Sequence, residues 1–213
     1  MSETSASQRP KQARSIRTEQ ALLDALERLL IDRSFADLTV SVLAREAGLT
    51  TGAIYRRFKD KEDVLRAAFQ RFYERSEEQT ALNAAAFPAD LDDRALLGKY
   101  VSELMTFTLE HIHLMRAANH LNDIGSFELM TRARSLSADW LSARLTSSPL
   151  PEELLRQRTR FVLRVVTATF RDTFLSGAGQ VSAENGIGED RQREHERLCN
   201  NLVDLACGYL GVV

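Results

Sequence analysis

The sequence predicts an all-α fold with a small N-terminal helical domain and a larger C-terminal helical domain. Apolar residues recur at spacings of three and four through most of the chain, which is the period of one helical face. No stretch shows the apolar and polar alternation typical of strands. Helix breakers between Pro88 and Asp93 interrupt the pattern. We therefore expect a tail at 1–15 and domains at 16–79 and 80–213.

The composition is that of an ordinary globular protein, with 44% hydrophobic residues. No run of about 18 apolar residues is present, and the first residues lack the apolar core of a secretion signal. We therefore expect a cytoplasmic protein without a membrane partner. Cys199 and Cys207 lie eight positions apart in a predicted helix, a separation of about 12 Å that predicts two free thiols.

The charge is distributed unevenly along the chain. Residues 1–75 hold 14 Lys and Arg against 11 Asp and Glu, whereas residues 76–213 hold 14 against 19. The asymmetry is modest, and it fits either a nucleic-acid partner for the first part or two ordinary solvated surfaces.

The first 15 residues lack hydrophobic periodicity and carry Arg9, Lys11 and Arg14, so we expect a flexible basic tail that can reach phosphates. The apolar residues of 16–31 then mark one face of an amphipathic helix, the first of three in this domain. Phe35 follows as a candidate plug for its core.

A pair of short helices is predicted within 39–61. In the first, Val40, Leu43, Ala44 and Ala47 share one face, Thr39 can cap the free amides, and Gly48 can end the helix in the left-handed conformation.

In the second short helix, Thr50 or Thr51 is the candidate cap, and Ile54 and Phe58 provide the buried edge. The remaining positions are small and then aromatic and cationic, which suits close approach to a DNA duplex. Asp60 is expected to cap the following helix.

These residues closely resemble the DNA-binding domain of TetR-family transcription regulators. The family motif is matched by Leu43, Ala44, Ala47, Gly48, Gly52, Ile54, Tyr55, Phe58 and Lys61, and approximately by Val64 and Leu65. Ser34 departs from the pattern, because the family usually has glycine there; a left-handed Ser34 would cost on the order of 1 kcal/mol.

The resemblance implies DNA-contacting roles for Thr39, Thr50, Thr51, Gly52, Tyr55, Arg56, Arg57 and Lys61. Thr39, Tyr55 and Lys61 match positions that hold backbone phosphates. Arg56 is the candidate for reading a guanine, although a second phosphate contact is an equal alternative. Arg57 is expected to contact phosphate or face solvent. Lys61→Ala is accordingly expected to weaken binding to all sequences and to lower its salt dependence.

Four long helices are predicted in the C-terminal part, at 96–118, 127–145, 152–176 and 191–211, with a glycine-rich loop before the last. The third is apolar almost all round, which exceeds what one core needs. The resemblance implies that the last two helices form a homodimer interface, for which we name Phe161, Val162, Val165, Thr169, Leu202, Leu205 and Tyr209.

Polar residues interrupt the apolar stripes of the first two of these helices, as in ligand cavities. The candidate lining residues are Tyr100, Leu104, Thr108, His111, Met115, Asn119, Phe127 and Trp140. The resemblance implies a small-molecule effector there, and nothing in the spacing identifies it. Each of these residues could equally be an ordinary core or surface position.

No catalytic, cofactor or metal site is predicted. Glu110 and His113 have a spacing found in di-iron bundles, but the second copy that such sites need is missing. The favoured function is a dimeric, sequence-specific DNA-binding repressor released from a double-stranded operator by its effector. The alternative is a helical enzyme or interaction module with a vestigial helix-turn-helix.

Overall fold

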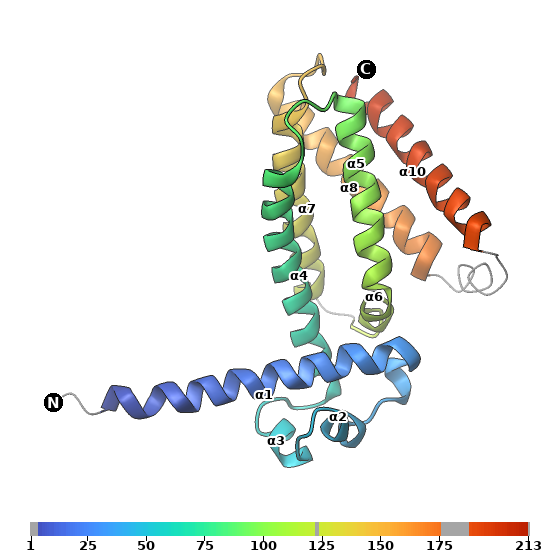
Figure 1. Ribbon diagram of the computed structural model, residues 1–213. Coiled ribbons are helices and arrows are strands. Elements are labelled where there is room, and N and C mark those ends of the chain that lie inside the picture. Colours follow the sequence, from blue (N-terminus) through green and yellow to red (C-terminus); the bar gives the residue numbers. More distant parts are fainter. Residues whose placement is uncertain (1–3, 122–123, 176–187, 213) are drawn as a thin grey trace. The chain divides into compact units, whose positions relative to one another are not determined.

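The computed structural model describes residues 4–121, 124–175 and 188–212, without the side chains of 4–14, 79, 81–85, 124–127, 188 and 189. Every regular element among these residues is helical, which confirms the all-α prediction. The elements are α1 (Thr4–Asp32), η1 (Phe35–Asp37), α2 (Val40–Glu46), α3 (Thr51–Tyr55), α4 (Lys61–Ala86), α5 (Asp93–Glu110), α6 (Ile112–Ala118), α7 (Ile124–Arg144), α8 (Glu152–Leu175) and α10 (Gly188–Leu210) (Figure 1). The glycine-rich loop predicted before α10 lies mostly outside the described residues. No helix in the described ranges is both long and apolar enough to cross a bilayer.

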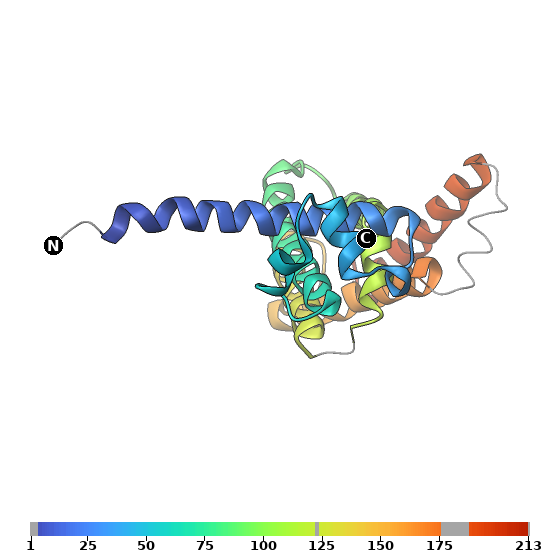
Figure 2. The ribbon, with the colours of Figure 1, turned by 90° about the horizontal axis from the view of Figure 1, so that it is seen from below.

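Helix α1 begins at Thr4, so most of the segment expected as an irregular tail is helical. Both views of the ribbon show this part of α1 running on past α2 and α3 (Figures 1 and 2). Gln, Lys, Arg and Ala are good helix formers even where no apolar face anchors them, which explains the longer helix. The phosphate contacts expected of Arg9, Lys11 and Arg14 concern side chains that lie outside the described residues.

The helix predicted at 96–118 is two helices in the structure. Helix α5 ends at Glu110, His111 has a non-helical backbone (φ −111°, ψ 16°), and α6 starts at Ile112. No proline or glycine marks this break in the sequence. The helical period continues across it, so periodicity alone cannot reveal it.

The described residues form two compact units. The first contains residues up to Phe72 and residues 113–126, and the second contains residues 73–112 and those from Phe127 onward. The boundary between residues 72 and 73 lies within α4, and the chain re-enters the first unit at residue 113, within α6. The two units therefore do not coincide with the domains expected at 16–79 and 80–213, which assumed a single boundary near residue 80.

The core of the first unit joins α1, the short helices, the start of α4 and α6. Its buried side chains include Leu22, Leu26, Leu30, Phe35, Leu43, Ile54, Val64, Leu65, Phe72, Leu114, Ala117 and Leu121. Phe35 fills the plug position expected of it, and its ring centroid lies 5.5 Å from that of His120. Ser34 is extended (φ −66°), not left-handed, and its hydroxyl accepts a hydrogen bond from Ala36 N at 3.3 Å. Serine at the family's glycine position is therefore accommodated without strain.

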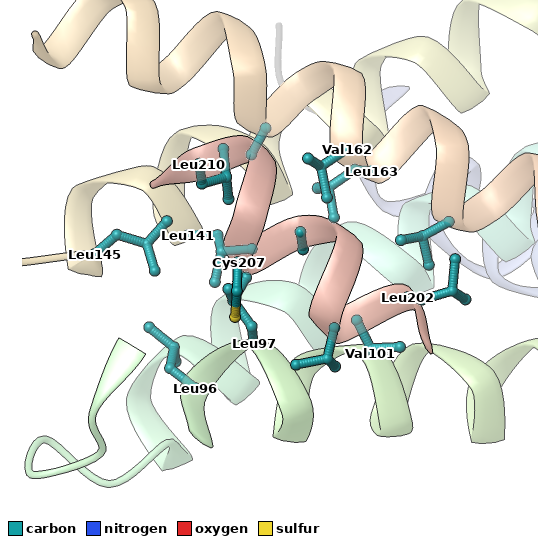
Figure 3. Close-up of a cluster of buried hydrophobic side chains, with 14 of the residues drawn as sticks. Leu96, Leu97, Val101, Leu141, Leu145, Val162, Leu163, Leu202, Cys207 and Leu210 are labelled. Carbon is teal, nitrogen blue, oxygen red and sulfur yellow. The ribbon is translucent and has the colours of Figure 1, made fainter. Parts of the chain in front are cut away.

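The core of the second unit lies between α5, α7, α8 and α10 (Figure 3). Leu96 and Leu97 come from α5, Leu141 from α7, Leu163 from α8 and Leu210 from α10. Burying a leucine contributes about 1.5–3 kcal/mol, so this layer holds the four helices together.

Asp93 fastens the start of α5 to the segment that follows α7. Its carboxylate is only 3% exposed, and it accepts hydrogen bonds from the backbone N–H groups of Thr146 (3.0 Å) and Ser147 (2.7 Å). The hydroxyls of the same two residues also donate to it, at 3.3 Å and 2.7 Å. Burial raises the pKa of Asp93, but these hydrogen bonds outweigh it and leave the pKa below its usual value.

Candidate nucleic-acid interface and ligand cavity

The helix pair at 39–61 has the local structure that its residue types predict. The Thr39 hydroxyl caps α2 by accepting from Val42 N at 3.3 Å, and the Thr50 hydroxyl caps α3 by accepting from Ala53 N at 3.2 Å. Gly48 adopts φ 66°, and Leu49 N donates to Ala44 O at 2.8 Å to close α2. These three features fix the tight turn between the two helices.

One side of α3 is buried and the other is open to solvent. Ile54 and Phe58 are 2% and 9% exposed, whereas Tyr55 is 58% exposed. The other predicted DNA contacts of this element, Thr50, Thr51, Gly52 and Arg56, are exposed as well. A methyl group at Gly52 would meet no atom of the chain within 4 Å, so internal packing does not require glycine there. An approaching partner molecule is a better reason for the small residue.

Arg57 is engaged with α1. Its guanidinium donates to the Ser15 carbonyl at 2.6 Å and to the Ser15 hydroxyl, and its Nε lies 3.2 Å from a Glu19 carboxylate oxygen. These contacts hold the end of the recognition element against α1. They leave Arg57 poorly placed for the phosphate contact considered for it, while the residue remains exposed to solvent, as the other expectation has it.

Lys61 is also used inside the domain, which corrects the role expected for it. Its ammonium group donates to the carbonyls of Phe35, Ala36 and Leu38 at 3.0, 3.1 and 2.9 Å. It also lies 4.7 Å from the centre of the Phe35 ring. An ammonium group has three hydrogens, so none remains for a DNA phosphate. Lys61 closes η1 and so positions the start of α2.

Two exposed cations near the motif were missed by sequence reasoning. Arg45, in the last turn of α2, and Lys59, after α3, have side chains without an ion-pair partner among the described residues. The motif comparison passed over them because it followed positions that match the family. Their free positive charge makes them the better candidates for non-specific phosphate contacts.

The second unit contains a cavity of about 570 Å³. Its walls come from α4, α5, α7 and the break after α5: Arg75, Ser76, Thr80, Tyr100, Glu103, Leu104, Thr106, Phe107, Glu110, His111, Ser137 and Trp140. Four predicted lining residues, Tyr100, Leu104, His111 and Trp140, are among them. Three aromatic rings and Leu104 line the cavity together with eight polar or charged residues, and such a mixture of apolar and polar groups can bind a small molecule.

The other four predicted lining residues have different positions. Thr108 is 7% exposed, and its hydroxyl donates to Leu104 O at 2.7 Å instead of facing the cavity. Met115 and Asn119 follow the end of helix α5 at His111 and belong to the first unit. The side chain of Phe127 lies outside the described residues. The α4 wall was missed because lining residues were sought only on the helices predicted at 96–118 and 127–145.

Two of the cavity groups have defined protonation. Burial raises the pKa of Tyr100 to about 12, outweighing a hydrogen bond with Ser137 that lowers it, so its phenol is neutral at pH 7. His111 Nδ1 lies 2.9 Å from the Phe107 carbonyl, which can only accept, so Nδ1 carries a hydrogen.

An apolar surface remains uncovered where α8 meets α10. Phe161, Leu205 and Tyr209 are 50%, 46% and 40% exposed, and the rings of Phe161 and Tyr209 lie 5.5 Å apart. We call these three residues the aromatic face. Val165 and Thr169 are half-buried. Val162 and Leu202 are 1% and 5% exposed, so these two predicted interface residues belong to the core of the single chain.

The capped α2, the glycine turn and the exposed face of α3 together form a helix-turn-helix, a motif that many DNA-binding proteins use. Comparison with known proteins specifies the class further. The family described as "Bacterial regulatory proteins, tetR family" matches residues 22–68, which cover most of the first unit.

Two curated relatives each match about a third of this chain. The fatty acid metabolism regulator protein of Bacillus subtilis (strain 168) is 35% identical over 69 residues, 30% of this chain and 36% of that protein. The HTH-type transcriptional repressor BepR of Brucella suis biovar 1 (strain 1330) is 34% identical over 79 residues, 37% of each protein. The chain therefore spans little more than a third of the length of the curated relatives it matches.

Over nearly its whole length, the chain resembles solved structures in fold rather than in sequence. A tetR-family transcriptional regulator from Streptomyces coelicolor has a TM-score of 0.64 at 18% identity, over 90% of this chain and 82% of that one. Residues 22–68 thus resemble the DNA-binding part of the TetR family of bacterial regulatory proteins, and the whole chain shares the fold of a solved member of that family.

Proposed function

We propose that this protein is a homodimeric, sequence-specific regulator of transcription that represses its target genes and is released from double-stranded operator DNA by a small-molecule effector. The observation that carries the proposal is the exposed, cation-bearing face of α3 on a turn fixed by Thr39, Gly48 and Thr50. The relative BepR, a transcriptional repressor, supports the direction of regulation.

A gel-shift titration tests the DNA-binding part. The labelled probe is the fragment upstream of the protein's own gene, and an unrelated fragment of equal length and base composition is the control. The proposal expects tighter binding to the upstream fragment. Equal affinity for both fragments would favour the alternative of a vestigial helix-turn-helix.

Arg56 is proposed to read a base. Arg56→Ala is expected to flatten the preference among operator variants by about 1–3 kcal/mol at one position, the usual value of a bidentate contact with guanine. Lys59→Ala is the matched control, because its side chain is exposed and forms no ion pair with any residue that the structure describes; it should weaken binding to all variants alike. Binding titrations against a set of single-base operator variants measure both. An equal loss on every variant in Arg56→Ala would assign this arginine to a phosphate instead.

The aromatic face is proposed to form the dimer interface. Phe161→Glu places a charge within it and is expected to produce monomers at concentrations where the wild type sediments as a dimer. Leu136→Glu is the control, because Leu136 is 44% exposed on α7, outside the aromatic face. A dimer that survives Phe161→Glu, or one lost equally in both variants, would place the interface elsewhere.

Two copies would present their recognition helices about 34–36 Å apart, one turn of the duplex. An effector in the cavity lined by Tyr100 and Trp140 must then favour a conformation of the dimer in which the spacing of the two recognition helices does not match the operator. Linkage requires that DNA and effector weaken each other's binding by the same factor. A compound that fills the cavity with unchanged affinity in the presence of operator is not the inducer.

A further inference from the structure

The cavity of the second unit contains a tryptophan that its neighbours hold in place. Trp140, on α7, is the only tryptophan of the chain, and it lines the cavity. Its ring centroid lies 5.2 Å from that of Phe87 and 6.0 Å from that of Tyr100, and the Arg144 guanidinium lies 5.8 Å from it. A ring fixed in this way offers a rigid surface that an aromatic ligand can stack on or meet edge-on.

Aliphatic groups make up little of the cavity wall. Leu104 is the only aliphatic hydrophobic residue among the described residues that line the cavity, beside three aromatic residues and eight polar or charged ones. A ligand with a long alkyl body would press hydrocarbon against polar groups, which is unfavourable because those groups lose contact with water. The wall therefore favours an aromatic body over an aliphatic one.

Several hydrogens of the polar wall residues are already used within the chain. The hydroxyls of Thr80 and Thr106 donate to the backbone carbonyls four positions before them, at 2.9 Å and 3.1 Å. His111 donates its Nδ1 hydrogen to a carbonyl in the same way. Arg75, the only Lys or Arg among the described lining residues, also interacts with another group of the chain. The two threonine oxygens keep lone pairs, so a ligand that donates hydrogen bonds fits this wall.

Glu110 places a negative charge at the same cavity. It is exposed at the opening, and its carboxylate forms no ion pair with any residue that the structure describes. Glu110 is also the last residue of α5, where a carboxylate meets the negative end of the helix dipole and destabilises the helix. A positively charged ligand group beside Glu110 would offset that cost.

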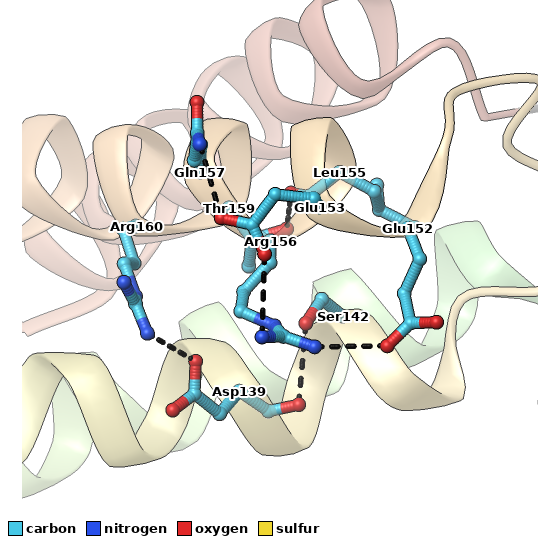
Figure 4. A network of polar contacts seen from close by, with 9 residues as sticks. All are labelled: Asp139, Ser142, Glu152, Glu153, Leu155, Arg156, Gln157, Thr159 and Arg160. Carbon is cyan, nitrogen blue, oxygen red and sulfur yellow. Dashed lines mark hydrogen bonds and ion pairs between the residues drawn. The ribbon is translucent and has the colours of Figure 1, made fainter.

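Two other glutamates of the second unit already have cationic partners. Glu103, which also lines the cavity, pairs with Lys99 at 2.7 Å. On α8, the Arg156 guanidinium reaches the carboxylate of Glu152 at 2.8 Å (Figure 4). Because Lys99 offsets the charge of Glu103, Glu110 is the cavity carboxylate that a ligand cation can pair with.

Glu110 and the fixed tryptophan lie far apart along the cavity. Tyr100, which contacts Trp140, precedes Glu110 by ten positions on α5, and at about 1.5 Å per residue this is a rise of about 15 Å. We propose that the cavity binds an elongated aromatic amine, with its rings beside Trp140 and its ammonium group at Glu110. An ammonium group donates three hydrogens and accepts none, which matches the lone pairs of the wall. This inference rests on the proposed role of the cavity as the effector site, and it names the class of effector.

The fluorescence of Trp140 tests the ligand class without DNA, because the chain has no other tryptophan. Full-length protein at pH 7 is titrated with 4-phenylbenzylamine, with 4-biphenylacetate, which has the same rings and the opposite charge, and with octylamine, which has the charge without the rings. The emission is expected to change with saturation in 4-phenylbenzylamine. The other two probes are expected to bind at least about tenfold more weakly.

Two variants test the part of the site that would hold the amine. Glu110→Gln is expected to weaken the binding of 4-phenylbenzylamine about tenfold, because it removes the charge with which the ammonium group pairs. Its ligand-free melting temperature should not fall, since the substitution removes a carboxylate from the unfavourable end of α5. Glu152→Gln removes the same charge outside the cavity wall and is expected to bind the amine as the wild type does.

Binding of 4-biphenylacetate or octylamine as tight as that of 4-phenylbenzylamine would overturn the proposal. An unchanged emission with all three probes would also overturn it, as would equal affinities of Glu110→Gln and Glu152→Gln for the amine. The gel shift with the upstream fragment separates this inference from the proposed function. An amine that binds as expected without releasing the DNA keeps the ligand class and refutes the effector role, and a fragment that is not preferred leaves the fluorescence result standing.

Discussion

Lys61→Met is expected to lower the free energy of unfolding of the first unit by about 2–3 kcal/mol, because it deletes a charged donor shared by three carbonyls. Methionine keeps the length of the side chain and part of its contact with Phe35. The carbonyls of η1 lose their donor, and the start of α2 loses its support. Denaturant unfolding followed by circular dichroism measures the change.

DNA binding separates this structural role from the phosphate contact that the family motif implies. If Lys61 only positions η1, Lys61→Met should weaken binding to all operators alike, because a smaller fraction of the molecules is folded. The dependence of the DNA affinity of the folded protein on salt concentration should stay unchanged. Lys59→Met, at an exposed lysine two residues earlier, should leave the unfolding free energy unchanged. Unaltered stability in Lys61→Met, together with a salt slope reduced by about 1, would restore Lys61 to the DNA interface.

Asp93→Asn is expected to destabilise the second unit by on the order of 3 kcal/mol at pH 7. The substitution replaces a carboxylate that accepts from two backbone amides and two hydroxyls with an amide that has one oxygen and two hydrogens. One amide oxygen cannot accept from all four donors, and the NH₂ group of asparagine would face donors that the second carboxylate oxygen now binds. Thermal melts compare it with Asp90→Asn, an exposed and unpaired aspartate that should have no effect.

The stabilising effect of Asp93 depends on pH in a direction set by its lowered pKa. A carboxylate whose pKa is lower when folded stabilises fully above its unfolded pKa, about 3.9, and loses the contribution as pH falls through the folded value. The difference in stability between wild type and Asp93→Asn should therefore be constant near neutrality and vanish only below about pH 4. A difference that disappears between pH 5 and 7 would contradict this assignment.

The local features of the DNA-binding element could be predicted because each depends on residues within one turn. The caps at Thr39 and Thr50 and the left-handed Gly48 follow from side-chain oxygens and from the absence of a Cβ. The burial of Ile54 and Phe58 follows from their spacing of four on a helix.

Features that depend on distant residues could not be predicted. Lys61 binds carbonyls that precede it by more than twenty positions, and backbone acceptors leave no sequence signal. Arg57 is similar, because its partners Ser15 and Glu19 lie in α1. In both cases the resemblance to the family suggested a DNA contact for the cation, whereas the structure shows its side chain bound to groups within the domain.

The cavity was predicted in part for the same reason. The face containing Tyr100 and Leu104 has mixed polarity that a pattern can reveal. The residues of α4 that complete the wall read as one more amphipathic helix. The break at His111, which separates Met115 from this cavity, occurs without a residue that breaks helices.

The path of the chain between the two units also affects how the protein is made. Residues 113–126 complete the first unit but are synthesised after residues 73–112 of the second. Domains generally fold in the order in which they leave the ribosome. Here the N-terminal unit cannot close over Leu114 and Leu121 until translation has passed residue 126. Nascent chains released before that point would expose the apolar surface that these two side chains cover, and a gene fragment ending near residue 80 would encode an incomplete DNA-binding unit.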